Sequence, residues 1–199
     1  MVKQLSIGVI GIQGARSEHI TSMQKALKET NKSGKVFIVK DKEEINKLDA
    51  LIIPGGESST ISRILFNSGL YETISNRIKK QDLPIMGTCA GCVLLASELI
   101  DNTKDIKLLN AIDMQVERNA FGRQRQSFEK NILIDGFSKT FNAVFIRAPE
   151  IKKTWGKCET IAKIDKKIIM VRQDNMLALA FHPELTDDFR IHKYFLDMI

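Results

Sequence analysis

A strand, a tight turn bearing a cysteine and a helical pattern follow one another over residues 84–99, and this order constrains the fold more than any other feature. The turn is Gly87-Thr88-Cys89-Ala90-Gly91, and the apolar helical pattern that follows comprises Val93, Leu94, Ala96 and Leu99. It is the cysteine version of Gly-x-Ser-x-Gly, which presents a nucleophile between a strand and a helix. The small neighbours leave room for a substrate, and the backbone N–H of Ala90 points toward a developing oxyanion. The segment therefore predicts an α/β sheet with a candidate nucleophile at a strand end.

Two other interpretations of Cys89 fit the same segment. Cysteine is among the most buried residue types, so Cys89 can be an ordinary core residue. Cys89 and Cys92 also form a C-x-x-C pair, which in an α/β chain can carry out redox chemistry. The rest of the sequence has to decide between these interpretations.

Size and composition favour one globular domain over residues 1–199. The chain is 43% hydrophobic and 27% charged, which is ordinary for a globular protein. Its three cysteines argue against a disulfide framework, and no apolar run approaches the ~20 residues of a membrane span. We therefore expect a cytoplasmic protein. The net charge of +6 comes from lysines interspersed with acids, as in Lys40–Glu44, which indicates solvated faces rather than a nucleic-acid surface.

Strands and helices alternate in the first half of the chain. The predicted strands are 5–12, 36–39, 50–53 and the run into Cys89. The predicted helices are 16–30, a short one capped by Asp41 with Glu44 in a capping box, one with Ile61, Ile64 and Leu65 inward that closes at Gly69, and 70–80. Such alternation predicts a mainly parallel sheet with helices on both faces.

The second half has strands joined by short connections. The predicted strands are 112–117, 127–134, 144–147, 160–164, 168–172 and 177–181, and a final helix is predicted over 187–197. Asp174-Asn175 marks a hairpin turn. The predicted fold class is a single-domain, three-layer α/β sandwich with a mixed, mainly parallel sheet flanked by helices.

His182-Pro183-Glu184 follows the last predicted strand. In an extended segment, residues i and i+2 face the same side, so Glu184 can reach one nitrogen of His182 while the other faces a nucleophile. A lone histidine is more often structural, but strand ends are where α/β proteins place their sites. Cys89 followed by His182 and Glu184 is the order of nucleophile, base and orienting acid in α/β hydrolases.

The segment Pro54-Gly55-Gly56-Glu57-Ser58 ends the third predicted strand. Two glycines at a strand end leave backbone N–H groups free and let a ligand approach. The segment can also be a simple tight turn before a helix capped by Ser58 or Ser59. Together with the cysteine turn, it is suited to form the other wall of an oxyanion hole, with N–H groups near Gly56 and Ala90.

These motifs resemble the triad-type (class I) glutamine amidotransferase family, and within it the glutaminase subunits of pyridoxal 5′-phosphate synthase. The resemblance implies a flavodoxin-like, class I glutamine amidotransferase fold and covers residues 8–190. It is carried by Gly8–Ala15 with Glu18 and His19, Pro54–Ser58, Gly87–Gly91, Val116–Gln124 with Ser127–Glu129, Phe145–Pro149, and Phe181–Thr186. The cysteine turn and His-Pro-Glu are shared by all such amidotransferases, whereas Val116–Gln124 and Phe145–Pro149 are specific to these subunits.

The resemblance implies a role for each matching residue. Cys89, His182 and Glu184 would be the catalytic triad. Glutamine would be held by Gly55, Gly56, Glu57, Arg118, Ile146 (through its backbone) and Arg147. Gln13 would help to arrange the oxyanion site when a partner docks, and His19 is interpreted as an interface or surface residue. Arg123 and Arg125 would serve the loop or the partner surface.

By this resemblance, the chain hydrolyses L-glutamine to L-glutamate and ammonia through a γ-glutamyl thioester. The ammonia would pass to a separate pyridoxal 5′-phosphate synthase subunit in a hetero-oligomeric complex. We expect no cofactor or metal on this chain, and neither nucleic acid nor membrane as a partner. Three alternatives stay open: the glutaminase of another amidotransferase, a regulatory subunit that binds glutamine without hydrolysing it, and a redox protein using Cys89 and Cys92.

Overall fold

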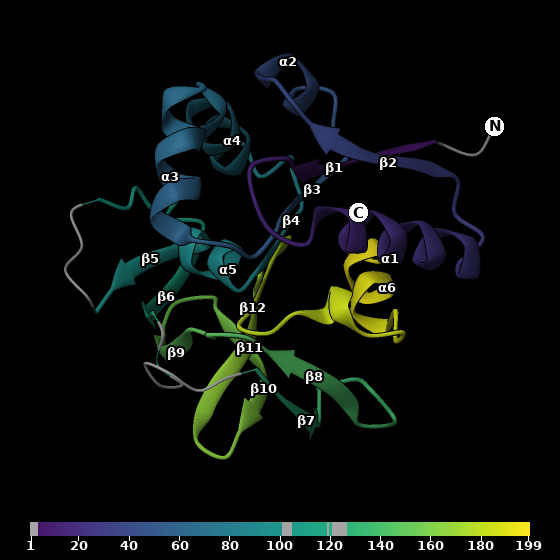
Figure 1. Cartoon of the computed structure of the whole chain (residues 1–199), viewed down its shortest axis with the longest axis vertical. Helices are drawn as coiled ribbons and strands as arrows, with labels where there is room; N and C mark the ends of the chain where they lie inside the picture. The colour runs from purple at the N-terminus through teal and green to yellow at the C-terminus, as the bar shows by residue number, and fades with distance from the viewer. Residues whose placement is uncertain (1–3, 101–104, 119, 121–126) are drawn as a thin grey trace.

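One mixed sheet with helices on both faces forms the framework of the molecule, as a computed structural model shows (Figure 1). The structure describes residues 4–100, 105–118, 120 and 127–199. The strand order is β2-β1-β3-β4-β12-β11-β9-β6-β5, with β10 pairing β11 outside this path; β7 and β8 form a separate pair. The neighbours from β2 to β12 are parallel, and β12, β11, β9 and β6 pair antiparallel in turn.

The strands and helices have the following bounds. The strands are β1 (Leu5–Ile10), β2 (Gly34–Val39), β3 (Ala50–Ile53), β4 (Ile85–Thr88), β5 (Ala96–Leu99), β6 (Ile112–Glu117), β7 (Phe128–Ile132), β8 (Phe141–Phe145), β9 (Glu150–Thr154), β10 (Glu159–Ile164), β11 (Lys167–Gln173) and β12 (Met176–Leu179). The helices are α1 (Arg16–Glu29), α2 (Lys42–Ile45), α3 (Ser58–Asn67), α4 (Leu70–Lys79), α5 (Ala90–Leu95), the short 3-10 helix η1 (Pro183–Leu185) and α6 (Arg190–Leu196).

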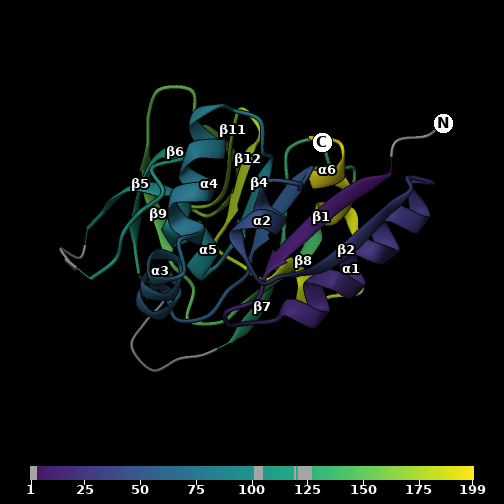
Figure 2. The same ribbon diagram turned by 90° about the horizontal axis from the view of Figure 1, so that it is seen from above.

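Alternate residues of the central strands face opposite sides of the sheet and build two cores. In β3, Ala50 and Ile52 join the core that α1 and α6 cover, while Leu51 and Ile53 join the core under α3, α4 and α5. Figure 2 shows α1 and α6 on one side of the sheet and α3 to α5 on the other. The predicted mixed, mainly parallel sheet with helices on both faces is therefore confirmed. None of the described helices combines the length and the apolar character that crossing a bilayer requires.

The carboxyl ends of β1, β3, β4 and β12 meet at one edge of the sheet, because these strands run parallel. Thr88, the last residue of β4, pairs with Leu179, the last residue of β12. The backbone N–H of Cys89 donates to the carbonyl of Leu179 at 2.8 Å. The register thus brings the cysteine turn beside the segment that leads to His182, although the two are far apart in sequence.

The helix after Cys89 is shorter than predicted. It ends at Leu95, and Ala96 adopts extended backbone (φ −65°, ψ 158°) to begin β5. Ala96 pairs with Ile112 of β6, so the apolar residues Ala96 and Leu99 belong to a strand and the predicted helical pattern through them is wrong. A short apolar run fits either element, and here pairing with β6 decides.

Other differences concern strand ends and one helix face. The predicted strand at 144–147 ends at Phe145, and β9 was not predicted, because its EIKKT sequence buries only Glu150 and Ile151. Ile64 is 39% exposed rather than inward, while Ile61 and Leu65, four residues apart, form the buried stripe of α3. The Asp41 cap of α2 is confirmed, since its carboxylate accepts from the Glu44 N–H at 2.9 Å.

Candidate active site

Cys89 sits on a strained turn between β4 and α5. Its backbone has φ 49° and ψ −104°, a conformation that L residues rarely adopt and that costs about 1–3 kcal/mol. The glycines on either side of the turn, Gly87 and Gly91, make it possible because the neighbouring backbone leaves no room for a side chain at either position. A Cβ on Gly91 would lie 2.0 Å from the Ile53 carbonyl oxygen, and one on Gly87 would lie 2.6 Å from the Gly91 carbonyl. The structure therefore requires both glycines for backbone packing, beyond the substrate access that the sequence suggested.

His182 and Glu184 are in contact as predicted, but for a different reason. His182 Nδ1 lies 2.7 Å from Glu184 Oε1. The segment is not extended: His182 precedes the 3-10 helix η1, which begins at Pro183 and bends the chain so that Glu184 turns back to the imidazole. The predicted alternation along an extended segment is wrong, because proline at the start of a helical turn favours that turn.

The electrostatics of the pair favour a charged imidazole. Burial would lower the pKa of His182, but hydrogen bonds with Cys89 and Glu184 and the charge of Glu184 outweigh it and raise that pKa to about 10. Burial would raise the pKa of Glu184, yet His19 and His182 together bring it below its ordinary value. At neutral pH, an imidazolium on His182 thus lies between the Cys89 sulfur and an ionised Glu184.

His19 is not at an interface or on the surface, so that sequence interpretation is wrong. It is fully buried, and its Nε2 lies 3.3 Å from Glu184 Oε2. The reason is the packing of α1 against α6 and η1. A signal was present in the sequence: His19, Met23 and Ala26 recur at helical spacing, and all three are buried on one face of α1.

The loop after β3 lies directly against Cys89 and His182. A Cβ on Gly55 would come within 2.5 Å of His182 Cε1 and 3.3 Å of the Cys89 Cβ, so only glycine leaves the pair in place. Gly56 has φ 141°, which favours glycine. Gln13 Oε1 accepts from the Glu57 N–H at 3.0 Å, which ties the loop after β1 to the loop after β3.

Glu57, and neither Ser58 nor Ser59, caps α3. Its carboxylate accepts from the backbone N–H groups of Ser59 (3.1 Å) and Thr60 (2.7 Å). Partial burial opposes ionisation, but the hydrogen bonds from Thr60 and Ser59 outweigh it and lower the pKa of Glu57 to about 2. The exposed carboxylate is therefore a fixed negative charge at the site.

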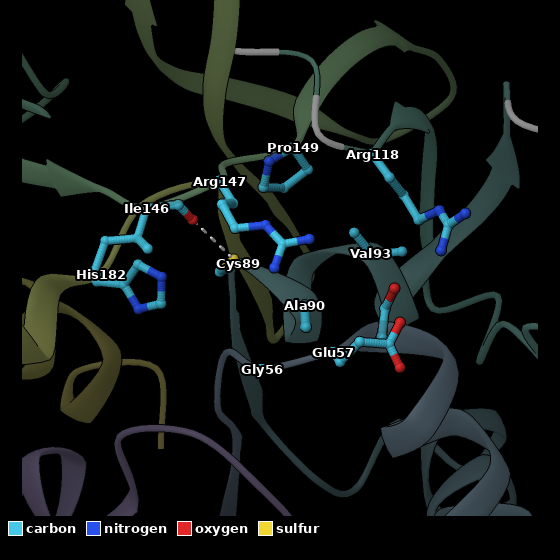
Figure 3. A pocket seen from close by; sticks show the side chains of 11 residues that line it. Gly56, Glu57, Cys89, Ala90, Val93, Arg118, Ile146, Arg147, Pro149 and His182 are labelled. Atoms are coloured by element: carbon cyan, nitrogen blue, oxygen red, sulfur yellow. Dashed lines mark hydrogen bonds between the residues drawn. The ribbon is translucent and has the colours of Figure 1, made fainter. Parts of the chain in front are cut away.

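A cavity of about 270 Å³ opens in front of Cys89 (Figure 3). Its lining includes most of the predicted residues and adds Ser58, Val93 and Pro149: Gly56, Glu57, Ser58, Cys89, Ala90, Val93, Arg118, Ile146, Arg147, Pro149 and His182. The predicted residues Gly55, Gln13 and Glu184 do not line it. The sequence pattern places Val93 on the apolar face of the helix, and Pro149 lies in a block already singled out, but nothing in the sequence alone distinguishes either as lining.

The segment after β8 supplies the opposite wall. The Cys89 sulfur lies 3.8 Å from the Ile146 carbonyl oxygen. Arg147 has φ 46°, and Figure 3 shows its guanidinium extending past Cys89 toward the side where Glu57 and Arg118 lie. The lining of the cavity thus combines the Cys89 thiol with charged side chains of both signs. The predicted residues Asn119, Phe121–Gln124 and Arg125 lie outside the described residues.

Comparisons with known proteins give one consistent result. Residues 9–199 match the model of the SNO glutamine amidotransferase family. A protein named pyridoxal 5′-phosphate synthase subunit PdxT from Pyrococcus furiosus is 46% identical over 196 residues, covering 98% of this chain and 99% of that protein. A protein of the same name from Staphylothermus marinus is 46% identical over 204 residues, covering 98% of each chain.

Solved structures agree with this result. The crystal structure of a glutamine amidotransferase superposes with a TM-score of 0.85 at 39% identity, covering 96% of this chain and 97% of that one. A Thermotoga maritima glutamine amidotransferase has a TM-score of 0.63 at 14% identity, covering 98% of this chain and 84% of that one, and shares the fold.

Proposed function

Since the chain belongs to the SNO glutamine amidotransferase family, we propose that it hydrolyses L-glutamine to L-glutamate and ammonia with Cys89 as nucleophile. The observation that carries this proposal is the arrangement of Cys89, His182 and Glu184 at one sheet edge. Cys89 sits on a strained turn that faces a cavity, His182 lies between the sulfur and Glu184, and the acid holds the far nitrogen at 2.7 Å. This is the geometry of nucleophile, base and orienting group.

The reaction starts with attack of the Cys89 sulfur on the side-chain amide carbon of glutamine. A sulfur–carbon bond forms, and the carbonyl electrons move to the oxygen. The carbon–nitrogen bond then breaks as His182 gives its proton to the departing nitrogen, which leaves as ammonia. A water molecule gives a proton to His182 and attacks the γ-glutamyl thioester, releasing glutamate and the thiolate. Glu184 keeps the proton-bearing Nδ1 of His182 turned away from the sulfur.

Backbone N–H groups of Gly56 and Ala90 would stabilise the oxyanion, because both residues line the cavity beside Cys89. Gln13 does not line it, but its side chain holds the Glu57 N–H and so fixes the orientation of the peptide that follows Gly56. We assign Gln13 the role of arranging this peptide when a partner docks.

The charged side chains of the cavity lining suit the amino-acid end of glutamine. The guanidinium groups of Arg118 and Arg147 match an α-carboxylate, which an arginine binds through two parallel hydrogen bonds. The ionised Glu57 suits the α-ammonium group. Gly55 would shape the base of the site, and the Ile146 backbone would contact the substrate from the opposite wall.

The proposed acceptor of the ammonia is a separate pyridoxal 5′-phosphate synthase subunit. The relatives that match almost end to end are named as subunits of that synthase. Ammonia is lost unless it is used at once, so a complex of the two subunits follows from the chemistry. We further propose that residues 1–199 form one glutaminase domain, and that it works in the cytoplasm, where unpaired cysteines such as Cys89, Cys92 and Cys158 persist.

Two alternatives make different predictions. A redox protein would need Cys92 to reach solvent or substrate, yet Cys92 is fully buried and burial raises the pKa of its thiol. A regulator that only binds glutamine would not need His182 and Glu184 in contact behind the cysteine. The redox alternative also leaves the family membership unexplained.

Glutamate release from glutamine, measured with and without the synthase subunit, tests the proposal. We expect the partner to stimulate release, Cys89→Ala to lower kcat by at least about 10⁴-fold, and the matched control Cys92→Ala to keep most activity. Turnover in Cys89→Ala would refute the proposed nucleophile. A folded wild-type protein that binds both glutamine and the partner but releases no glutamate would favour the regulator.

A further inference from the structure

A cluster of buried polar side chains lies behind Glu184, and the mechanism above does not use it. It comprises His19 of α1, Thr88 of β4 and His192 of α6, all fully buried. We call these three residues the rear cluster. Each comes from a different element, and buried polar groups of this kind cost stability unless they are hydrogen-bonded to one another.

His19 connects the rear cluster to the triad. Its Nδ1 lies 3.3 Å from His192 Nε2, and its Nε2 lies 3.1 Å from Thr88 Oγ1 and 3.3 Å from Glu184 Oε2. Glu184 uses Oε1 for His182. Within the described residues, its buried Oε2 has no aligned hydrogen-bond partner, so the nearby His19 nitrogen is the group placed to supply one. Catalytic hydrogen bonds often lengthen without substrate and tighten in the complex.

The positions of the protons follow from the two buried atoms without aligned partners. If His19 carried its proton on Nδ1, it would donate to His192 Nε2, and His192 would bury an N–H on Nδ1 with no acceptor among the described residues. The lone pair of His19 Nε2 would then also face the Glu184 carboxylate. In the opposite assignment, His192 Nε2–H donates to His19 Nδ1, and the His19 Nε2–H faces Glu184 Oε2 and Thr88 Oγ1. The repulsion between the lone pair and the carboxylate is then removed. His192 Nδ1 stays without a partner among the described residues, but it buries a lone pair rather than an N–H donor.

We propose that His19 is a positioning residue, which directs its Nε2–H to Glu184 Oε2 and holds the carboxylate so that Oε1 accepts from His182. The inference rests on the proposed glutaminase function for its catalytic consequence. His19 is not among the residues that line the cavity, and it contacts Glu184, so it acts through that carboxylate. His192 fixes the tautomer of His19, and the rear cluster thereby ties α1 and α6 to the triad.

The surroundings of His19 favour its neutral form, in which Nε2–H is a hydrogen-bond donor. Burial lowers the pKa of His19, and burial also lowers the pKa of His192 to about 3. The groups facing Glu184 are therefore the cationic His182, which Cys89 adjoins, and the neutral His19, with His192 behind it. On the outer side, Glu18, Lys25 and Asp187 line a surface hollow that reaches Glu184. Loss of the His19 N–H would leave Glu184 harder to ionise and would weaken its hold on the His182 imidazolium.

Two amide variants of His19 distinguish hydrogen-bond donation to Glu184 from a packing role alone. In His19→Gln, the amide nitrogen can occupy the position of Nε2 and still donate to Glu184. In His19→Asn, it can occupy the position of Nδ1 and remains near His192 only. Met23→Ala is the stability control, because Met23 is fully buried on the same face of α1 but belongs to the apolar core.

The readout is the pH dependence of Cys89 alkylation by iodoacetamide, followed by mass spectrometry of the Cys89 peptide. It reports the charge state of the Cys89–His182 pair and needs no glutamine turnover. We expect the acidic limb of the profile to lie about one pH unit higher in His19→Asn than in the wild type. A shift of this size corresponds to the loss of one hydrogen bond to a buried charge. His19→Gln and Met23→Ala are expected to keep the wild-type limb.

Steady-state kinetics with the synthase subunit present gives the second readout. We expect kcat to fall about tenfold in His19→Asn with KM unchanged, and to recover within about twofold in His19→Gln. Failure of the wild type to turn over glutamine would refute the proposed function, while the alkylation profile would still test His19.

Three results would overturn the proposal: an unmoved limb in folded His19→Asn, equal shifts in the Asn and Gln variants, or an equal shift in Met23→Ala. If His19→Asn does not fold, His192→Phe takes its place, since it keeps a ring in α6 but withdraws the hydrogen bond to His19 Nδ1. An upward shift in that variant supports the proposal, and an unmoved limb contradicts it.

Discussion

Gly55→Ala is the substitution whose effect can be worked out most directly from the structure. The backbone of Gly55 lies outside the left-handed region, so alanine fits its conformation. The new Cβ, however, would lie 2.5 Å from His182 Cε1, whereas ordinary contact begins at 3.4 Å. The imidazole must therefore move by about 0.9 Å, away from its position between Cys89 and Glu184.

A displacement of this size has a known order of magnitude in catalysis. A misplacement of about 1 Å costs roughly 10²-fold in rate, or about 2.7 kcal/mol in the activation free energy. We expect kcat of Gly55→Ala to fall by about that factor. KM should change little, because the new methyl group does not approach Arg118 or Arg147, the arginines proposed to bind glutamine. The assay is glutamate release at saturating glutamine with the synthase subunit present.

Gly136→Ala is the matched control. Gly136 has φ 85°, and no heavy atom of the described residues lies within 4 Å of the position that a Cβ would take there. Alanine at this position therefore costs about 1–2 kcal/mol of stability through backbone strain alone. We expect it to lower the melting temperature without changing kcat. Wild-type kcat in a folded Gly55→Ala protein would refute the reasoning, because it would mean that His182 need not keep its observed position.

Two further predictions concern the charges of the proposed triad. Glu184→Gln should impair turnover by up to about 10⁴-fold without abolishing it, as when the orienting acid of a serine protease is replaced, and glutamate release measures this; an unchanged kcat would contradict the orienting role. Because the pKa of His182 rises from 6.5 to about 10 on folding, its charge stabilises the folded state fully below pH 6.5, and this contribution is lost as the pH rises through 10. The difference in melting temperature between wild type and His182→Gln should shrink over that range, and a constant difference would count against the raised pKa.

The sequence was most informative where chemistry and local structure coincide. A nucleophile on a strand-to-helix turn needs small neighbours, which the glycines around Cys89 supply. The alternating strands and helices predicted a mainly parallel sheet with helices on both faces. The topology then placed Cys89 and His182 at neighbouring strand ends. The contact of His182 with Glu184 was also predicted, although it depends on η1 rather than on an extended segment, since the local pattern does not separate these two geometries.

Features that depend on residues remote in the sequence were harder to predict. Ala96–Leu99 forms a strand because β6 pairs with it, and β9 is a strand because its neighbours supply pairing that its lysine-rich sequence does not suggest. His19 was placed wrongly because its partners, Glu184 and His192, lie on segments remote in sequence. The helical spacing of His19 with Met23 and Ala26 indicated burial, but a histidine at such a position does not reveal what it contacts.

The central claim is that Cys89 carries the γ-glutamyl group during turnover. The most direct measurement is acid quenching of the wild-type protein while it turns over glutamine with the synthase subunit, followed by peptide mass spectrometry. The account predicts a γ-glutamyl thioester on the peptide that contains Cys89, absent from Cys89→Ala and unchanged in Cys92→Ala. A thioester on Cys92 or Cys158, or turnover by Cys89→Ala, would contradict it.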